Sequence, residues 1–405
     1  MLAITLVITV SAPLALAQRG AAPRIVVIGD IHGNLEGVVG LLRHAGITDE
    51  NGRWIAGHTI VVQTGDYTDR GPKVRAVMDL LMDLEQQSAA AGGRLVVLIG
   101  NHEVMNMVGE HRDVTPAIYA TFADEKSAQR REAAYEAYLK FCAARAAPFQ
   151  GSSPRLYQPV SKSEWMAAHP PGALEYWEAF GPRGRYGRWL RTKSTVLQLG
   201  DTVFMHAGIN PERAARRLDD INKQVTSEIK RFDEYRSRLI DRQLILPSFT
   251  LSEILTAAQI EVAIPAALSK SAQTGPQESL EAVTIPDPLR LAELLRIDRW
   301  ALLDPEGPLW FRGFATWSPE SGAVEMKNLM QRYNVAHFVV GHTVLEAKRV
   351  TPRFSGAVVL IDTGMVFPGG VASALEIRDG QFTAIYPEER TLLFEAGERL
   401  APAVR

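Results

Sequence analysis

The feature that most constrains this chain is a pattern in which an apolar strand ends at Gly-Asp or Gly-Asn, three times in succession. The strands are predicted at 24–28, 60–64 and 95–99. The pairs that end them are Gly29-Asp30, Gly65-Asp66 and Gly100-Asn101. Their Val, Ile and Leu residues are nearly continuous, which is typical of strands buried in a parallel sheet. Because the carboxyl ends of such strands meet at one edge of the sheet, the pattern predicts a ligand site there.

The spacing of these motifs fits successive strand–helix units. Asp30, Asp66 and Asn101 are 36 and 35 residues apart. The segments 34–45 and 74–91, which separate the strands, have apolar residues at helical spacing. Further buried strands are predicted at 194–199, 202–205, 336–340 and 358–361. The chain is therefore expected to have an α/β fold.

The segments between these strands are predicted to be mostly helical and peripheral. The expected structures are a helix pair over 116–150, an irregular helical cap rich in aromatic residues over 152–190, charged helices over 212–262 and a mobile loop over 264–290. The aromatic residues of the cap either form a small core of their own or line a substrate cleft.

Composition excludes several classes of function. The net charge of −2 predicts no general affinity for nucleic acid or for an anionic membrane, so any phosphate recognition must be local. The single cysteine, Cys142, excludes an intramolecular disulfide and a thiolate metal cluster, and its apolar neighbours place it in the core. The 405 residues suffice for one large domain with insertions or for two domains.

The N-terminus has the features of a secretory leader. Residues 2–16 are almost all apolar or small, and Ala15-Leu16-Ala17 fits the small-x-small pattern of a cleavage site. The run is too short and too interrupted for a comfortable membrane span, although no Lys or Arg precedes it. The sequence predicts a signal peptide over 1–17, cleavage after Ala17, and a periplasmic or secreted protein without stable membrane association after cleavage. A residual membrane anchor is the alternative.

The polar residues at the strand ends are metal ligands by type. Carboxylate, amide oxygen and imidazole without thiolate suit Mn, Fe, Zn, Co or Mg. Two ligand groups are available, namely Asp30 with His32, and Asn101 with His206 and His342. Asp66 can bridge them, because paired ions in such sites lie about 3.5–4 Å apart. A pair of ions activates water and clamps the oxygens of an in-line phosphoryl displacement.

Three further motif residues are available for catalysis. His102 is well placed to protonate a leaving alkoxide or phenoxide, with Asp69 holding its other ring nitrogen. Arg70 is a fork-shaped donor for phosphate oxygens. Taken singly, each motif also fits a plain turn, a helix cap or a surface ion pair. Their order, each at the end of an apolar strand, favours a site.

These motifs resemble those of the calcineurin-like metallophosphoesterases. They are Gly29-Asp30-Ile31-His32-Gly33, Gly65-Asp66-Tyr67-Thr68-Asp69-Arg70-Gly71, Gly100-Asn101-His102-Glu103, His206-Ala207-Gly208 and Gly341-His342-Thr343. Within this family the chain resembles the phosphoprotein phosphatase branch, because an Asp-Arg-Gly follows Asp66. The segments that resemble its bacterial-type Shewanella-like protein phosphatases are Gly100-Asn101-His102-Glu103-Val104-Met105-Asn106 with Gly109-Glu110-His111-Arg112, Leu309-Trp310-Phe311-Arg312-Gly313 and Val339-Val340-Gly341-His342-Thr343-Val344. The resemblance covers most of residues 24–375.

The resemblance implies a fold and a domain organisation. The fold would be a β-sandwich of two mixed sheets flanked by helices, in four α/β/β/α layers. The domain would span 24–390, with helical insertions at about 112–192 and 212–305.

The resemblance also implies a role for each motif residue. One metal would be held by Asp30, His32 and Asp66, and the other by Asp66, Asn101, His206 and His342. The general acid would be His102, paired with Asp69. Phosphate would be held by Arg70, Arg312 and Asn101, and of these Arg312 could not be singled out by spacing.

Two positions depart from the family pattern. Ala207 stands where a Gly is common, which is a small change. Asp113 stands where a Tyr often follows the third motif, near the expected substrate rim. Both phosphotyrosine and phosphoserine or phosphothreonine therefore stay candidate substrates. The histidines outside the motifs are expected to make ordinary hydrogen bonds, and they are His44, His58, His111, His169 and His337. Of these, His111 is the closest to a motif.

The expected function is that of a binuclear-metal-dependent phosphomonoesterase that works by direct attack of a metal-bridging hydroxide. Its substrate would be a phosphorylated protein or peptide, or a small phosphomonoester. Mn is the expected metal, with Fe, Zn or Co as options. Two alternatives use the same scaffold: a dinucleoside polyphosphate or phosphodiester hydrolase, and a metal-binding or phosphate-binding module without turnover. The complete ligand set and the His102–Asp69 pair argue against the second alternative.

Overall fold

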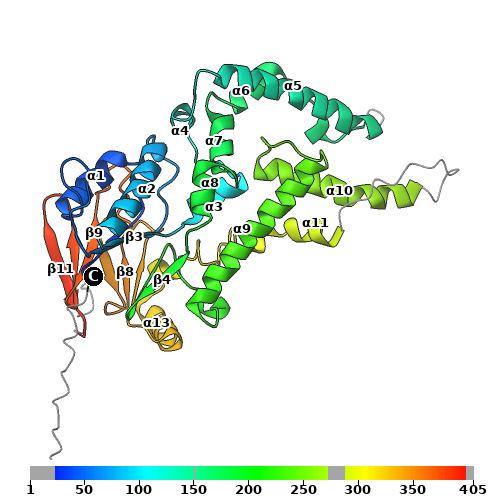
Figure 1. Cartoon of the computed structure of the whole chain (residues 1–405). Helices are drawn as coiled ribbons and strands as arrows, with labels where there is room; N and C mark the ends of the chain where they lie inside the picture. Colours follow the sequence, from blue (N-terminus) through cyan, green and yellow to red (C-terminus); the bar gives the residue numbers. More distant parts are fainter. Residues whose placement is uncertain (1–22, 150–151, 272–287, 398–405) are drawn as a thin grey trace, which may run out of the picture.

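The computed structural model describes residues 23–149, 152–271 and 288–397, without the side chains of 264–271 and 288–290. Two β-sheets form the centre of the molecule, and helices lie on both sides of them (Figure 1). The predicted leader, residues 1–17, lies outside the described residues. Among the described helices, none combines the length and the apolar character needed to cross a membrane.

The first sheet contains the three motif strands. Its strand order is β11-β10-β9-β1-β2-β3, and β1, β2 and β3 are parallel whereas β9 runs antiparallel to β1. The bounds are β1 Ile25–Ile28, β2 Ile60–Gln63, β3 Arg94–Val97, β9 Ala374–Arg378, β10 Gln381–Ile385 and β11 Arg390–Glu395. The last residues of the parallel strands, Ile28, Gln63 and Val97, are partners in the register. The three motifs therefore begin at the same edge of the sheet.

The second sheet carries the fourth and fifth motifs. Its order is β4-β5-β6-β8-β7, with β5, β6 and β8 parallel and an antiparallel strand at each side. The bounds are β4 Val196–Leu199, β5 Thr202–Met205, β6 His337–Val340, β7 Thr351–Arg353 and β8 Val358–Leu360. Both sheets are therefore mixed.

Alternation along the strands builds a four-layer sandwich. In β1, Val27 faces the second sheet and belongs to the same buried cluster as Phe204 and Val339. Val26 and Ile28 face the other way, into the cluster that contains the helices. Because successive side chains of a strand point to opposite faces, each central strand contributes to two cores. The prediction of two mixed sheets flanked by helices is confirmed.

Three helices cover the outer faces of the sheets. α1 (Leu35–His44) and α2 (Val74–Ala90) lie on the first sheet, and α13 (Pro319–Tyr333) lies on the second (Figure 1). The side chains of Asn34 and Ser318 accept backbone N–H hydrogen bonds and so begin α1 and α13. Each helix buries one apolar face against the sheet beneath it.

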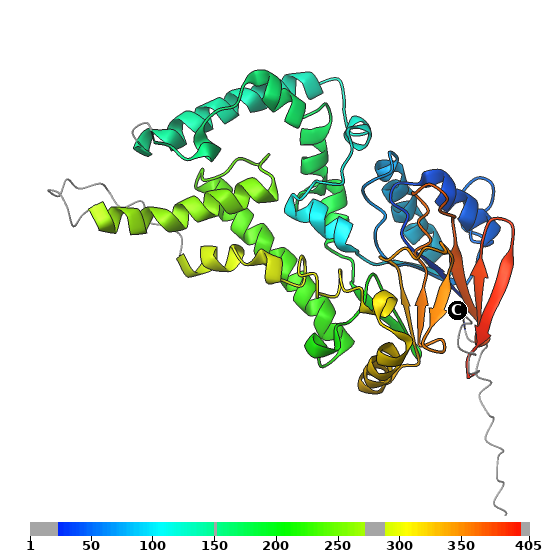
Figure 2. The ribbon, with the colours of Figure 1, turned by 180° about the vertical axis from the view of Figure 1, so that it is seen from behind.

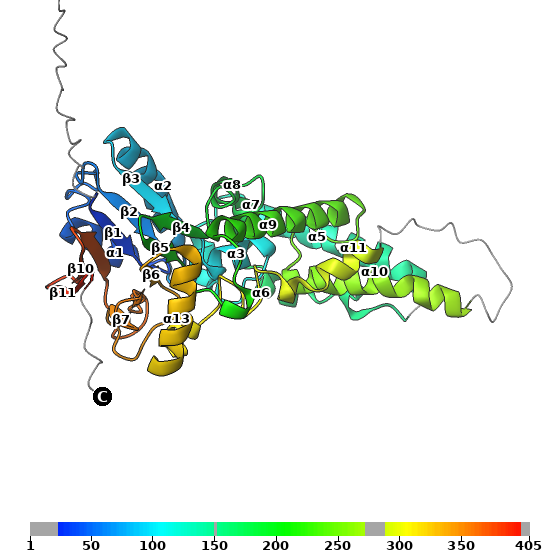
Figure 3. The same ribbon diagram turned by 90° about the horizontal axis from the view of Figure 1, so that it is seen from below.

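Most of the remaining helices project from one end of the sandwich (Figure 2). Their bounds are α3 Asn101–Val108, α4 Pro116–Ala120, α5 Ser127–Ala146, α6 Lys162–Ala168, α7 Ala173–Phe180, α8 Arg185–Leu190, α9 Leu218–Asp241, α10 Leu251–Ser271, α11 Pro288–Leu294 and α12 Gly313–Thr316. We call α4 to α11 the helical arm. Figure 3 shows α9, α10 and α11 extending away from the sheets, and α11 contacts both α9 and α10. Tyr176, Phe232 and Ile254 belong to one buried cluster, so the arm is packed rather than open.

Two expectations from the sequence need correction. α10 continues to Ser271, so the predicted mobile loop is wrong for 264–271, where Ala and Leu favour a helix. The remainder of that segment before α11 lies outside the described residues. The sequence analysis also missed strands β9 to β11. A signal was present, because Asp379 and Gly380 have φ values of 52° and 81° and form a two-residue hairpin turn.

Candidate metal centre

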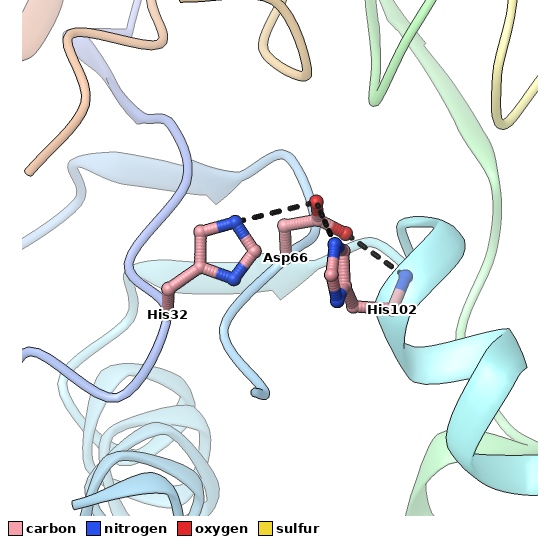
Figure 4. A group of neighbouring side chains, drawn as sticks. All are labelled: His32, Asp66 and His102. Atoms are coloured by element: carbon pink, nitrogen blue, oxygen red, sulfur yellow. Dashed lines mark hydrogen bonds and ion pairs between the residues drawn. The ribbon is translucent and has the colours of Figure 1, made fainter. Parts of the chain in front are cut away.

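The loops after the strands place the predicted site residues around one buried carboxylate, Asp66. Its Oδ2 lies 3.6 Å from Nε2 of His32, 3.7 Å from Nε2 of His102 and 3.3 Å from Nε2 of His206. Figure 4 shows Asp66 between the rings of His32 and His102. Two groups of three side chains can each hold a metal ion, and Asp66 belongs to both: His32, Asp66 and His102, and Asp66, His206 and His342.

The second group brings three acceptor atoms together. Nδ1 of His206 donates to the Thr64 carbonyl oxygen at 3.2 Å, and Nε2 of His342 donates to the Trp310 carbonyl oxygen at 3.0 Å. The remaining ring nitrogens, Nε2 of His206 and Nδ1 of His342, face each other at 3.0 Å. Oδ1 of Asn101 lies 2.9 Å from Nε2 of His206. Two imidazole nitrogens and an amide oxygen that converge in this way, with each ring oriented through its other nitrogen, fit a metal ion.

His32 presents a lone pair in the same way on the other side of the shared carboxylate. Its Nδ1 donates to the Thr68 carbonyl oxygen at 2.8 Å, and Nη1 of Arg70 donates to its Nε2 at 2.5 Å. Burial lowers the pKa of His32 to about 3, so the ring is neutral, as a metal ligand must be. Asp30 lies outside both groups, 4.0 Å from Nε2 of His32, and accepts the backbone N–H of His342 at 3.1 Å.

Three buried carboxylates crowd this centre. Burial, together with Asp362 and Asp66, raises the pKa of Asp30 well above its usual value. Burial also raises the pKa of Asp362. Burial would raise the pKa of Asp66 as well, but His206 and His102 outweigh it and hold that pKa well below its usual value. Buried negative charge of this density is stabilised by bound cations.

His102 is held by a carboxylate rather than by a carbonyl group. Its Nδ1 donates to Oδ2 of Asp69 at 2.7 Å, and Asn106 donates to Oδ1 of Asp69 at 2.7 Å. The hydroxyl of Tyr176 donates to Asn106 at 2.6 Å. Burial lowers the pKa of His102, but Asp66 and the bond to Asp69 outweigh it and raise the pKa to about 9. A protonated imidazole donates protons and does not bind metals, so the geometry favours His102 as an acid.

Two arginines flank the centre. Arg70 spans two imidazoles, because its Nη1 bonds to His32 while its Nη2 lies 3.0 Å from Nε2 of His102. Arg312 donates from Nη1 to the carbonyl oxygen of His342 at 2.9 Å. Each guanidinium has further N–H groups that can reach the oxygens of a phosphate bound at the centre.

Glu103 determines the conformation of the turn that carries Asp66. Its buried carboxylate accepts backbone N–H groups from Asp66 at 2.8 Å, Tyr67 at 3.0 Å and Thr68 at 3.0 Å, and from Gly100 at 2.8 Å. The sequence analysis did not assign Glu103. The available signal was its place as the third residue of α3, where Glu commonly completes a capping box.

The backbone of the site is strained. Left-handed φ values occur at His32 (46°), Asp66 (58°), Asp69 (66°), Arg70 (63°) and His342 (67°). Such values cost about 1–3 kcal/mol each outside glycine and gather at functional sites. Gly100 and Gly341, which precede two of the predicted ligands, instead leave room for neighbouring carboxylates. A Cβ atom at Gly100 would overlap the Asp66 carboxylate, and one at Gly341 would overlap the Asp30 carboxylate.

The structure brings all of the site residues predicted from the sequence to one place. They are Asp30, His32, Asp66, Asp69, Arg70, Asn101, His102, His206, Arg312 and His342. Asp113 also lies there, with Oδ2 4.0 Å from Nδ1 of His102. Besides Glu103, the sequence analysis missed Asn106 and Asp362. Asp362 follows a buried strand closely, so the strand-end pattern that indicated the other site residues also applied to it.

Comparison with known proteins identifies relatives of this chain. Residues 23–234 match the family model for calcineurin-like phosphoesterases. An uncharacterised protein of Schizosaccharomyces pombe is 27% identical over 346 residues, which are 84% of this chain and 73% of that protein. Shewanella-like protein phosphatase 2 of Arabidopsis thaliana is 31% identical over 224 residues, 52% of each chain. The match therefore spans about half the length of that phosphatase.

A solved structure shares the fold. The cold-active protein-tyrosine phosphatase of a psychrophilic Shewanella species aligns with a TM-score of 0.56 and 23% identity, over 92% of this chain and 80% of the other. These matches confirm the resemblance that the motifs indicated.

Proposed function

This chain belongs to the calcineurin-like phosphoesterase family, and from that premise we propose that it is a two-metal phosphomonoesterase that dephosphorylates proteins or peptides. Its relatives include named protein phosphatases, which supports a phosphorylated substrate. The strongest support within the site is the His102–Asp69 pair next to Arg70. Monoester hydrolysis needs a proton donor for the leaving oxygen and positive charge for the terminal oxygens, and these residues supply both.

The proposed metal ligands are those of the sequence analysis. One ion takes Asp30, His32 and Asp66, and the other takes Asp66, Asn101, His206 and His342. Mn is the expected ion, with Fe, Zn or Co as options. When bound, two such ions activate water as a nucleophile and neutralise phosphoryl charge. The chain holds the donors in place, since the carbonyl groups of Thr64, Thr68 and Trp310 determine which ring nitrogen of each histidine faces the centre.

Arg70 and Arg312 are proposed to bind the terminal phosphate oxygens, together with the amide of Asn101. In this role Arg70 exchanges its bond to His32 for phosphate oxygens. The ring of Phe367, 40% exposed, lies 5.2 Å from the Arg70 guanidinium. An aryl leaving group such as that of phosphotyrosine can pack beside this ring.

His102 is proposed to protonate the leaving oxygen. Because Nδ1 is bonded to Asp69, the proton available to substrate is on Nε2, and Arg70, whose Nη2 lies 3.0 Å from that nitrogen, must turn to the phosphate oxygens to leave it free. The raised pKa of His102, about 9, keeps that proton in place at neutral pH. Asn106 holds the far oxygen of Asp69 and so keeps the pair aligned.

Hydrolysis of p-nitrophenyl phosphate by the metal-free protein, before and after addition of Mn²⁺, tests this function. We expect turnover only with the metal, and a loss of about 100-fold or more in Asp66→Asn, since that residue touches both metal groups. Asp219→Asn, a change of the same kind on the exposed face of α9, is the matched control. Unchanged turnover in Asp66→Asn would refute the assignment. Two ions bound per chain without hydrolysis of any phosphoester would indicate a binding module instead.

The diester bis-p-nitrophenyl phosphate separates a monoesterase from a diesterase. We expect slower turnover of the diester, because Arg70 and Arg312 offer donors for more terminal oxygens than a diester has. Faster turnover of the diester would assign the chain to dinucleoside polyphosphate or phosphodiester hydrolysis.

We also propose export of the protein, on the basis of the apolar run and the small-x-small pattern that ends at Ala17. N-terminal sequencing of the mature protein checks this. A first residue of Gln18 is the expected result, and an intact Met1 would contradict it.

A further inference from the structure

A cavity of about 420 Å³ lies where the helical arm meets the end of α3. Its walls come from the segment after α3, from α4, from the end of α6, from α7 and from the first turn of α10. The side chains that matter here are Glu110, His111, Arg112, Tyr119, Trp177 and Glu253. The volume is within the range of small-ligand pockets. None of these residues has a part in the phosphoester chemistry proposed above.

Two aromatic side chains in this lining carry buried polar atoms that lack a well-formed hydrogen bond. Both ring nitrogens of His111 and Nε1 of Trp177 make no hydrogen bond of normal geometry within the described residues, although the Asn106 backbone lies near His111 and the Tyr119 hydroxyl lies near Trp177. Burial, helped by the charge of Arg236 and opposed by the Asn106 carbonyl group, lowers the pKa of His111 to about 3. The neutral ring therefore offers one donor and one acceptor. Because buried polar groups are nearly always paired, we expect these atoms to pair with a group that enters the cavity.

The lining matches a polypeptide better than a charged small molecule. The rings of His111 and Trp177 are stacked, with centroids 5.3 Å apart and planes 7° apart, and form a flat aromatic wall. The donor and acceptor of His111 and the donor of Trp177 suit the N–H and C=O groups of a main chain. The formal charges nearly cancel, with Glu110 and Glu253 against Arg112. Neither a strongly anionic nor a strongly cationic ligand is favoured.

The cavity lies at a distance from His102 that suits a peptide. His102 is in the first turn of α3, and Gly109, which lines the cavity, follows the last residue of that helix. With a rise of about 1.5 Å per residue, these positions are about 10 Å apart. An extended chain covers that distance with about three residues. Arg112 lies between the two regions, since its guanidinium is 5.9 Å from the ring of Trp310 beside the metal centre.

We propose that this cavity binds the polypeptide about three residues away from the phosphorylated residue. The site then selects phosphopeptides and phosphoproteins over small phosphomonoesters. This inference rests on the proposed phosphomonoesterase function, because His102 must face the leaving group for the cavity to meet its flanking chain.

A ladder of phosphotyrosine substrates tests the proposal with the metal-loaded full chain. The first member is capped phosphotyrosine, and alanines are added one at a time on either the amino or the carboxyl side. We expect kcat/KM to rise about tenfold when the third or fourth alanine is added on one side only, as two good hydrogen bonds would produce. The gain belongs in KM, because the segment binds substrate and transition state equally.

Two variants locate the gain. His111→Phe keeps the aromatic wall and removes both ring nitrogens, and Trp177→Phe removes the indole N–H. In each variant, the tenfold rise in kcat/KM along the ladder is expected to shrink by a factor of at least about three. Turnover of p-nitrophenyl phosphate is expected to change by less than about twofold. Trp54→Phe is the matched control, since Trp54 also donates through its indole N–H, to Gly57, but lies outside the cavity lining. Thermal unfolding of each variant checks that it folds.

A flat kcat/KM along both arms of the ladder overturns the inference, while hydrolysis of p-nitrophenyl phosphate still supports the proposed function. If the rise in kcat/KM along the ladder is unchanged in both variants, the peptide binds elsewhere, and the inference is overturned as well. If the loaded wild type hydrolyses no phosphomonoester at all, the proposed function and this inference both fail.

Discussion

At the residue scale, the partner of the second ring nitrogen distinguishes the proposed metal ligands from the proposed acid. His32, His206 and His342 each donate to a backbone carbonyl oxygen, which turns the other ring nitrogen towards the centre. His102 instead donates to the carboxylate of Asp69, which favours the charged ring. The same side-chain type is therefore held in two different ways within a few ångströms, which suits the two proposed roles.

Replacing His102 by Asn should affect poor leaving groups most. Phosphoserine leaves as an alkoxide and needs the proton, so we expect its kcat to fall about 100-fold or more. p-Nitrophenolate leaves without protonation, so its kcat should fall far less. Steady-state kinetics with a phosphoserine peptide and p-nitrophenyl phosphate measure the difference. His58→Asn, at an exposed histidine bonded to Gly92, is the control. Equal losses on both substrates would show that His102 is not the proton donor.

His111 should make the protein less stable in acid. Its folded pKa of about 3 is below the unfolded value of about 6.5, so the unfolded chain binds the proton first as pH falls. Between pH 7.5 and pH 5.0, His111 should therefore reduce the free energy of unfolding by about 2 kcal/mol at most. Urea unfolding of metal-free wild type and His111→Phe at both pH values measures the contribution. The variant should lose less stability in acid, and an identical loss would contradict the burial argument.

At the element scale, α3 supplies several functions from eight residues. It begins with Asn101, a ligand candidate, followed by His102 and by Glu103, which holds the turn of Asp66. Asn106 is four residues after His102 and so lies on the same face, where it reaches Asp69. Its C-terminus leads to the cavity. A change at the start of this helix should therefore disturb the metal centre before it disturbs the fold.

Gly100→Ala tests this dependence. The backbone of Gly100 is extended, with φ −102°, so Ala is strained only by its contacts with the carboxylate and the backbone nitrogen of Asp66 and with the ring of His206. We expect fewer bound metal ions per chain and a rate loss of about 100-fold, with the circular dichroism of the wild type.

Gly40→Ala is the control for this change. Nothing lies within 4 Å of a Cβ atom there, so in α1 it should stabilise the protein by about 0.5–1 kcal/mol and keep its activity. Full metal content in Gly100→Ala would contradict the steric argument.

At the scale of the whole molecule, the centre lies across the seam between the two sheets. Asp30, Asp66 and Asn101 follow strands of the first sheet, whereas His206 and His342 follow strands of the second. Bound ions would therefore link the two halves of the sandwich.

Metal binding should accordingly stabilise the global fold. At an ion concentration 100-fold above Kd, one site adds about 2.7 kcal/mol to the free energy of unfolding. Thermal unfolding with and without Mn²⁺ should show a higher Tm with the metal. His206→Ala should lose most of that shift, and His58→Ala should keep it. A Tm that does not respond to Mn²⁺ would mean that the two groups of side chains that share Asp66 do not hold ions.

The sequence by itself determined the ligand types and the edge at which they gather. An apolar run, a glycine and a polar residue are local features, and parallel strands bring their carboxyl ends together whatever their order. The side chains that gather at this edge could therefore be named in advance, and their role as metal ligands stays a prediction. The fold class followed from the resemblance of the motifs, while the three C-terminal strands did not, although Asp379-Gly380 carried a turn signal.

Only the tertiary structure decided which side chains meet across elements. Asp362 crowds Asp30, Arg70 spans His32 and His102, and His111 stacks on Trp177. These partners are far apart in the chain or belong to the irregular helical arm. Local periodicity places a residue on a face but does not say which distant face it contacts, because packing of the whole chain determines that. The strand-end site could thus be predicted, and the cavity beside it could not.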